Sequence, residues 1–570
     1  MVCLLVAFGK GCKSKDSRPV LKGPSSSNGG SAEPDTTQSG PNGPNPTDTG
    51  GDTSGKPAPD KDSKPDEVPI ASGWSLTSPK AGSTSTDTSP QIMGGSLKEY
   101  TGGKVKIFAD SACAKLLAEA KVSDEGTVRV TGIRYKANKS DDGLKAFYAI
   151  IEGAKNSSKC ADTKLFYSLD TDKPFAGSRF VRATFKADPA TTMNIGFDAR
   201  NTSKTEAKIF YGTEDHGRDT ASYTLTKTID KNVFYKGMYN AFSQLSGLKA
   251  DTTYYFVIKD AKGVSPVYSF RTLPDRPDVR LSIIAGGDSR NNRKPRQNAN
   301  LLVAKIRPHV VLFGGDMTNL GSTIEWIDWF EDWEKTMGAD GRLTPVVVTR
   351  GNHELTNSIL VNLFDITPEN YYALSFGGNL IRAYTLNTEA SIAGTQTEWL
   401  TADLKAHSEA TWRISQYHTP MRPHVSDKSE GNAQYQAWAK VFFDLNMDLV
   451  IESDAHTVKI TWPLEPSTGA GSDEGFKRND AKGTVYLGEG CWGAPLRDAD
   501  DAKAWTRDSG SFNHFNWLFV DQSKLEIRTI KVDNAENVGS LDEERRFEMP
   551  SGLDVWTPKN GSMITLKPKN

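Results

Sequence analysis

Residues 281–290 read Leu281-Ser-Ile-Ile-Ala-Gly-Gly-Asp-Ser-Arg290, and residues 310–319 read Val310-Val-Leu-Phe-Gly-Gly-Asp-Met-Thr-Asn319. In both stretches a short apolar run stops at two glycines and an aspartate, as a buried strand does when it enters a tight turn. Helix-like segments separate these runs from similar ones further along the chain. Alternation of strands and helices is typical of an α/β layer architecture. We therefore predict an α/β domain over residues 276–535.

Three further apolar runs of this domain end at polar residues in the same way. They are followed by Arg350-Gly-Asn-His-Glu354, by Tyr417-His-Thr-Pro420 and by Ser453-Asp-Ala-His456. Ligands of α/β sheets bind outside the carboxyl ends of the strands, so we expect all five clusters to meet in one crevice. Carboxylate, amide and imidazole groups gathered there are suitable ligands for metal ions.

In this order, the five clusters resemble the sequence blocks of the calcineurin-type metallophosphoesterases: Asp, Gly-Asp, Gly-Asn-His, His and a final x-x-His. Together with the β-rich segment that precedes them, the resemblance narrows to the purple acid phosphatases and covers residues 175–535. It implies an αββα-type sandwich for the catalytic domain, a dinuclear metal centre and the hydrolysis of phosphate esters.

The resemblance implies a metal ligand at each of five positions. Asp316 matches the carboxylate that bridges both metals, Asp288 and His456 match ligands of the first metal, and Asn352 and His418 match ligands of the second. Two cations about 3.5–4 Å apart hold the attacking and leaving oxygens in phosphoryl transfer. The sequence leaves open whether the metals are Fe, Mn, Zn or Mg.

Three residues are candidates for contact with the substrate. His353 matches the family's non-ligand histidine, which contacts phosphate and helps to protonate the leaving oxygen. Arg290 stands where the wider superfamily has a histidine; its guanidinium either binds phosphate oxygens or forms a structural ion pair. His424 lies six residues after His418, near the place of the family's further substrate-facing histidines but at a different spacing.

Two more positions depart from the family pattern. Asn319 replaces a tyrosine three residues after Asp316, so its amide oxygen or a water would complete the ligands of the first metal. Without a tyrosinate ligand, the charge-transfer colour that makes the family purple should be absent. Asp454 replaces a histidine ligand of the second metal. A carboxylate is a harder ligand and favours Mn, Mg or Fe over Zn. The alternative is that Asp454 points away and the second metal is weak or absent.

The segments ahead of the catalytic domain alternate apolar and polar residues with a period of two, which is typical of β-sandwiches. Residues 73–173 resemble a bacterial Ig-like module, in which Cys113 and Cys160 would pair in an oxidising compartment; the alternative is two buried thiols. Residues 174–275 resemble the fibronectin-III-like N-terminal domain of purple acid phosphatases, with Tyr254 at its tyrosine corner.

The N-terminus suggests export. Residues 1–12 resemble the end of a secretion signal with a lipobox-like Cys12, although a frayed terminus with an incidental cysteine is the alternative. Residues 13–72 are rich in Ser, Gly, Pro and Asp and are expected to form a disordered tether. We predict a periplasmic or cell-surface protein, whose membrane contact is limited to a lipid at Cys12. Residues 536–570 are expected to form a C-terminal extension.

Charge and composition restrict the function. The chain has 69 Lys and Arg against 71 Asp and Glu, a net charge of −2, which argues against a nucleic-acid binder. The expected partner is a small phosphate ester. We predict an exported phosphomonoesterase that resembles acid phosphatases. The alternatives are a phosphodiesterase of the same superfamily, and a degenerate domain that serves as a surface binding module.

Overall fold

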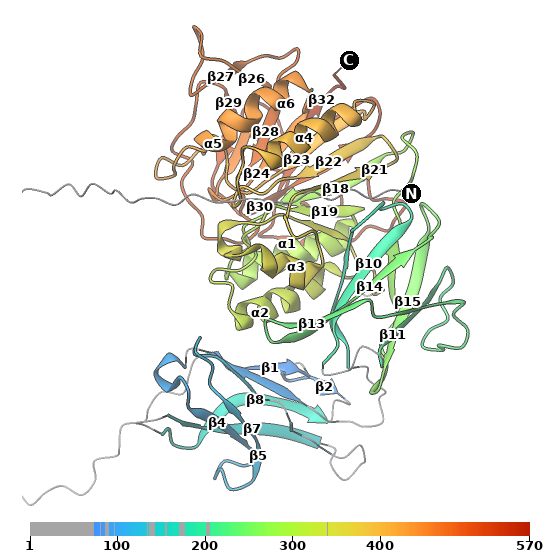
Figure 1. Ribbon diagram of the computed structural model, residues 1–570, viewed down its shortest axis with the longest axis vertical. Coiled ribbons are helices and arrows are strands. Elements are labelled where there is room, and N and C mark those ends of the chain that lie inside the picture. Colours follow the sequence, from blue (N-terminus) through green and yellow to red (C-terminus); the bar gives the residue numbers. More distant parts are fainter. Residues whose placement is uncertain are drawn as a thin grey trace, which may run out of the picture. The chain divides into compact units, whose positions relative to one another are not determined.

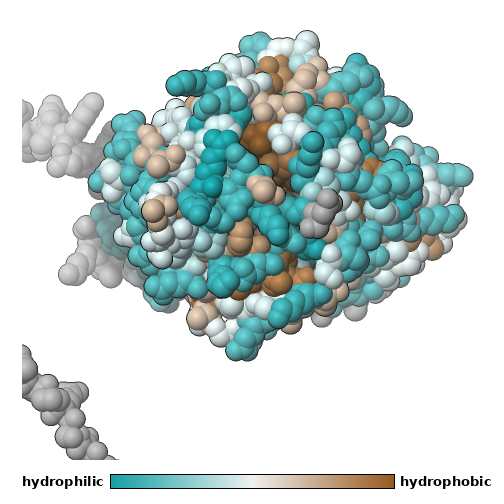
Figure 2. Space-filling model, turned by 90° about the horizontal axis from the view of Figure 1, so that it is seen from above, coloured by the Kyte–Doolittle hydropathy of each residue, from teal (hydrophilic) through white to brown (hydrophobic). Residues whose placement is uncertain are grey.

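The computed structural model describes residues 73–569 with short gaps at 80, 86–89, 96, 131, 134, 136–142, 154–156, 170–176, 201–205 and 339 (Figure 1). The predicted signal-like segment 1–12, which contains Cys12, and the predicted tether 13–72 lie outside the described residues. Within the described ranges, no helix is long and apolar enough to cross a membrane. On the face shown in Figure 2, hydrophobic residues form patches between larger hydrophilic areas.

The first module is built from two sheets. One sheet has the order β1 (Ser75–Ser78), β3 (Gln91–Gly94), β6 (Val128–Val130). The other has the order β2 (Thr84–Ser85), β8 (Ala161–Leu169), β7 (Gly143–Glu152), β4 (Lys104–Phe108), β5 (Leu116–Lys121). Both sheets contribute to one hydrophobic core, for example through Ile92 and Phe147. The alternating pattern of the sequence therefore reflects sheets with one buried face.

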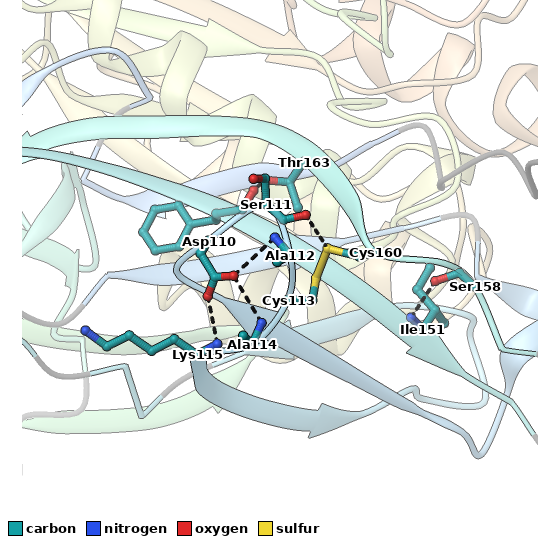
Figure 3. Close-up of a disulfide and its surroundings, with 11 residues drawn as sticks. Asp110, Ser111, Ala112, Cys113, Ala114, Lys115, Ile151, Ser158, Cys160 and Thr163 are labelled. Carbon is teal, nitrogen blue, oxygen red and sulfur yellow. Dashed lines mark hydrogen bonds between the residues drawn. A yellow bond between two sulfur atoms is a disulfide. The ribbon is translucent and has the colours of Figure 1, made fainter.

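The predicted disulfide between Cys113 and Cys160 is present, with the two Cα atoms 5.8 Å apart (Figure 3). It joins the turn after β4 to the start of β8. The Asp110 carboxylate orders this turn by accepting hydrogen bonds from the backbone N–H groups of Ala112, Ala114 and Lys115. The alternative of two buried thiols is therefore wrong.

The second domain also has two sheets. One has the order β13 (Lys231–Tyr235), β14 (Met238–Ser246), β10 (Thr192–Asp198), β9 (Arg179–Thr184). The other has the order β12 (Leu225–Thr228), β11 (Lys208–Gly212), β15 (Thr253–Asp260), β16 (Gly263–Val264), and β17 (Tyr268–Arg271) also pairs with β15. The backbone N–H of Lys249 donates to the Tyr254 hydroxyl at 2.9 Å, the contact expected of a tyrosine corner.

The third domain contains two larger sheets. The first has the order β20 (Val346–Val348), β19 (Val310–Phe313), β18 (Leu281–Gly286), β30 (His514–Val520), β31 (Leu525–Lys531), β32 (Ile564–Leu566). The second has the order β21 (Tyr372–Phe376), β22 (Ile381–Thr385), β23 (Trp412–Gln416), β24 (Leu449–Glu452), β28 (Val485–Gly488), β25 (Val458–Thr461), β29 (Thr506–Gly510). The segment predicted as a C-terminal extension thus adds β32 to the first sheet.

Alternate residues of β18 show how these sheets are layered. Ile283 packs into the core shared with Ile414 of the second sheet. Its neighbour Ile284 packs with α1 (Arg293–Ile306), α2 (Thr323–Trp333) and α3 (Asn357–Phe364). On the far side of the second sheet, Val450 packs with α4 (Thr395–Ala406) and α6 (Lys440–Asp444). The order of layers is helices, sheet, sheet, helices (Figure 1), as predicted for this domain.

Arg182 of β9 links the second domain to the third through buried contacts. Its Nε donates to the Leu363 carbonyl at 2.7 Å, and its Nη2 donates to Asn240 Oδ1 at 2.8 Å. Its guanidinium also lies 4.5 Å from the centre of the Phe330 ring, in a cation–π contact. Burial lowers the pKa of Arg182 to about 9, although the charges of acidic neighbours oppose the shift.

Candidate metal centre

Each of the five predicted clusters follows a strand of the two central sheets. Asp288 follows β18, Asp316 follows β19, and Asn352 begins a short 3-10 helix after β20. His418 follows β23, and Asp454 and His456 follow β24. Strands β18, β19 and β20 pair in parallel, as do β23 and β24. Within each sheet, the residues that follow these strands therefore lie at the same edge. The expected convergence is confirmed by the distances between their side chains.

Asp288, Asp316 and His456 form a first group, in which one donor atom from each residue lies within 4.8 Å of the others. His456 Nε2 is 3.3 Å from Asp288 Oδ1. The other ring nitrogen, Nδ1, lies 2.9 Å from the Pro495 carbonyl, which can only accept a hydrogen bond. Nδ1 therefore carries a proton, and Nε2 is the ring nitrogen that faces the carboxylates.

Asp316, His418 and Asp454 form a second group within the same distance limit, so Asp316 belongs to both. His418 Nε2 lies 3.3 Å from Asp316 Oδ1, 3.7 Å from Asp454 Oδ1 and 3.1 Å from Asn352 Oδ1. Its Nδ1 lies 2.8 Å from the Gly314 carbonyl and therefore donates to it. Both imidazoles thus present Nε2 to a cluster of oxygen atoms.

This arrangement is suited to cations bound between the side chains. Asp288 is fully buried, and its Oδ1 has no hydrogen-bond partner among the described residues. Burial would lower the pKa of His418, but Asp316 and Asp288 raise it well above the ordinary value. Burial would raise the pKa of Asp316, but the charge and hydrogen bond of His418 hold it far below its usual range. Clustered carboxylates with imidazole Nε2 atoms are a suitable donor set for two cations.

The backbone is strained at the residues that make up this cluster. The torsion angle φ lies between 53° and 67° at Asp288, Asp316, Asp454 and His456. Residues that carry a Cβ atom rarely adopt this left-handed region of backbone torsion angles, and such strain is concentrated at functional sites. Gly351 lies so close to Asp316 Oδ1 that a Cβ atom there would collide with it, and Gly490 is equally close to Asp288. These glycines leave room for the two carboxylates.

Glu354 supports the cluster and was missed by the sequence reasoning. Its fully buried carboxylate accepts the N–H groups of Asp316 at 2.8 Å, Met317 at 2.8 Å and Gly351 at 2.7 Å. It therefore ties the loop after β19 to the loop after β20. Burial and the charge of Asp316 raise the pKa of Glu354 to about 7. Its position directly after Gly-Asn-His was the available signal.

Arg290 and His353 lie beside Asp316. Arg290 Nη1 is 3.0 Å from Asp316 Oδ2, so the ion pair that the sequence left as one alternative is present. The His353 backbone N–H donates to Asp316 Oδ1 at 2.9 Å, and its ring Nε2 lies 3.9 Å from Asp316 Oδ2. His353 Nδ1 contacts the Asn319 carbonyl, which orients the ring.

One expectation for a site residue needs correction, and another is untested. His424 is fully buried, its Nε2 lies 2.7 Å from Thr506 Oγ1, and its Nδ1 lies 3.7 Å from Glu489 Oε1. Because both ring nitrogens face the protein interior, His424 is a structural residue and does not face the substrate. The hydrogen bonds described for Asn319 involve its backbone only, with Asn291 and His353. Its expected role as a ligand of the first metal therefore stays a prediction.

Comparison with known proteins agrees with this geometry. Residues 179–272 match the family model of the purple acid phosphatase N-terminal domain, and residues 291–458 match that of the calcineurin-like phosphoesterases. A solved purple acid phosphatase from yellow lupin seeds has 13% identity and a TM-score of 0.57, with 85% of this chain and 94% of that one covered. A structure of PhoD has 10% identity and a TM-score of 0.51, with 69% and 91% covered. No curated protein sequence matches the chain.

The fold and the two family matches define a metallophosphoesterase, a hydrolase of phosphate esters. More narrowly, residues 179–272 match the purple acid phosphatase N-terminal domain and stand ahead of the calcineurin-like phosphoesterase domain over residues 291–458.

Proposed function

We propose that this protein hydrolyses phosphate monoesters at a dinuclear metal centre. The proposal rests on one observation above all: Asp316 belongs to two adjacent groups of possible ligands, each completed by one histidine and one further aspartate, and all of them are buried except the partly buried Asp454. The proposed ligands are Asp288, Asp316 and His456 for the first metal, and Asp316, Asn352, His418 and Asp454 for the second. Because three of these ligands are carboxylates, Mn, Mg or Fe are better suited than Zn.

The chain's own residues supply the remaining chemistry. Two bound cations would stabilise the charge that develops on the attacking and leaving oxygens. Arg290 lies next to the shared carboxylate with its guanidinium 3.0 Å away, where it can also bind a phosphate oxygen. His353 holds its Nδ1 proton against the Asn319 carbonyl. A proton on His353 Nε2 is then directed at the centre, where it can pass to the leaving oxygen.

The alternatives to a phosphomonoesterase are a phosphodiesterase and a degenerate binding module. A phosphodiesterase would use the same centre on a substrate with one negative charge fewer. A degenerate binding module is favoured by the ion pairs of Arg290 with Asp316 and of Lys428 with Asp454, because both engage carboxylates of the centre.

We also propose that the protein is exported and that two β modules precede its catalytic domain. The Cys113–Cys160 disulfide supports a location where disulfides persist, and a lipid at Cys12 followed by the tether 13–72 would hold the protein at a membrane. The two-sheet modules at 73–173 and 174–275 would be Ig-like and fibronectin-III-like sandwiches ahead of the catalytic domain 276–535.

Metal analysis combined with substrate assays tests the function. The purified full chain is stripped of metal, reloaded separately with Mn, Fe, Zn or Mg, and assayed with an aryl phosphate and a bis-aryl phosphate. Two metals per chain and faster hydrolysis of the aryl phosphate are expected. Faster hydrolysis of the diester would favour the phosphodiesterase. Fewer than one metal per chain, with no hydrolysis, would favour the binding module.

A further inference from the structure

Asp454 has a cationic partner that its family resemblance does not predict. Lys428 Nζ lies 2.7 Å from Asp454 Oδ1. Lys428 belongs to the loop after β23, ten residues beyond His418. Its side chain is 23% exposed and that of Asp454 is 13% exposed, so the ion pair is largely shielded from water. An ion pair that is partly desolvated is stronger than a pair at the open surface.

The backbone of Asp454 is fixed independently of this ion pair. Its N–H donates to Asp288 Oδ2 at 2.9 Å, and its carbonyl accepts Arg497 Nη1 at 3.0 Å. The carboxylate itself has fewer constraints: Oδ1 lies 3.7 Å from His418 Nε2 and accepts the hydrogen bond of Lys428. Among the described residues, Lys428 is therefore the side chain that donates a hydrogen bond to the Asp454 carboxylate.

Charge explains why an aspartate at this position needs a partner. The centre gathers three carboxylates, those of Asp288, Asp316 and Asp454. Arg290 pairs with Asp316, and Lys428 pairs with Asp454. A histidine at position 454 would be a neutral ligand and would need no counter-charge, whereas a buried carboxylate without a partner is costly. A carboxylate also offers about four lone-pair positions, so a hydrogen bond from Lys428 leaves others free for a metal.

We propose that Lys428 is a positioning residue for the second metal of the proposed centre. It holds the Asp454 carboxylate towards His418 and offsets its charge, so that Asp454 and Lys428 together take the place of one histidine ligand. This inference rests on the proposed function. It assigns to Lys428 the role of an outer partner that orients a metal ligand, and no direct contact with the metal.

Calorimetric titration of metal-stripped full-length protein with Mn²⁺ tests this role without measuring activity. Removal of an outer partner typically costs about 10–100-fold in metal affinity. We expect Lys428→Met to weaken the second site by that factor while the first site is unchanged. Lys428→Arg, which keeps both donor and charge, should retain the affinity. In an Asp454→His background, Lys428→Met should have no effect, because the ligand is then neutral.

Lys440→Met is the matched control, since Lys440 forms a similar 2.7 Å pair with Asp444 at the surface, where the two side chains are 78% and 47% exposed. It should bind Mn²⁺ like the wild type. Thermal unfolding of each variant verifies that it is folded. The role of Lys428 is overturned if Lys428→Met binds the second Mn²⁺ as tightly as the wild type or more tightly. It is also overturned if the loss is the same in the Asp454→His background. A wild-type protein that binds fewer than two Mn²⁺ would instead refute the proposed centre itself.

Discussion

His418 and His456 show how single residues prepare the centre. Each donates its Nδ1 proton to a backbone carbonyl, that of Gly314 or Pro495, and turns Nε2 towards buried carboxylates. Such outer hydrogen bonds fix both the tautomer and the orientation of the ring. The ligand geometry therefore depends on the backbone of neighbouring loops as much as on the ligands themselves.

Asp316 is the residue on which both metals should depend. Asp316→Asn replaces a shared carboxylate by a neutral amide, and an amide bridges two cations poorly. We expect hydrolysis of an aryl phosphate to fall below about a tenth of the wild-type rate, with a lower metal content by mass spectrometry. Asp444→Asn, a change in a surface ion pair, is the control and should have the wild-type rate. Retention of most of the rate in Asp316→Asn would refute the two-metal mechanism.

Asp454 should determine which metal the second site prefers. Asp454→His replaces a hard carboxylate by an imidazole, so the preference should shift from Mn towards Zn. The pH profile of hydrolysis should move to lower pH, because one negative charge leaves the ligand set. Competition between Zn and Mn for the stripped protein measures the first effect. An unchanged Zn to Mn ratio would mean that Asp454 is not a ligand.

At the scale of secondary structure elements, a buried ion triad joins the second sheet to the centre. Lys459 of β25 lies 2.6 Å from Glu452 at the end of β24 and 2.6 Å from Glu489, which follows β28. The Glu489 carbonyl accepts the His456 backbone N–H at 2.8 Å. The triad thus holds the ends of three strands in the arrangement that the His456 ligand requires.

Lys459→Met should destabilise the catalytic domain, because it leaves two buried carboxylates without a cation. The expected loss in free energy of unfolding is about 3–5 kcal/mol at neutral pH, measured by urea denaturation. Lys477→Met, in a surface pair with Glu465, should cost no more than about 1 kcal/mol. Similar losses in the two variants would show that the triad contributes nothing specific.

The same triad predicts a dependence of stability on pH. Burial would raise the pKa of Glu489, but the charge of Lys459 and the hydrogen bond with His424 lower it from 4.5 to about 2. A depressed carboxyl pKa contributes stability above the unfolded-state value, and this contribution is lost as the pH falls from 4.5 towards 2. Lys459→Met should flatten that part of the curve. An equally steep curve in the variant would assign the acid sensitivity to other groups.

The sequence predicted those parts of the site that follow directly from strand ends. Asp288 and Asp316 stand immediately after apolar runs, and parallel strands bring their ends to one edge of a sheet. Lys428 could not be predicted, because it reaches Asp454 from a loop whose path depends on tertiary packing. His424 was misassigned for the same reason: spacing along the chain did not show that its ring points into the interior.

At the scale of the whole molecule, the two-sheet modules and the catalytic domain contribute different things. All proposed metal ligands lie between Asp288 and His456, within the catalytic domain. The second domain is attached to it by buried contacts such as that of Arg182 with the Leu363 carbonyl. The first module has its own core and its own covalent cross-link.

Removal of the disulfide should therefore lower the stability of the first module and leave the hydrolytic activity unchanged. The Cys113→Ser, Cys160→Ser double variant opens a loop of 47 residues, for which loop-closure entropy predicts a loss of about 4 kcal/mol in the first module. Hydrolysis should be unaffected. Limited proteolysis followed by an activity assay measures both, with the wild type as reference. Loss of hydrolysis in the variant would show that the module takes part in catalysis.

The position of β30 restricts when the centre can form during synthesis. This strand pairs with β18 inside the first sheet, yet its last residue, Val520, is made 232 residues after Asp288. At 5–20 residues per second, translation of that interval takes on the order of 10–50 s. Throughout this time Asp288 is present, but its strand β18 can pair only with β19 and lacks its second neighbour, β30. We therefore expect metal loading to be a late event, after β30 has joined the first sheet.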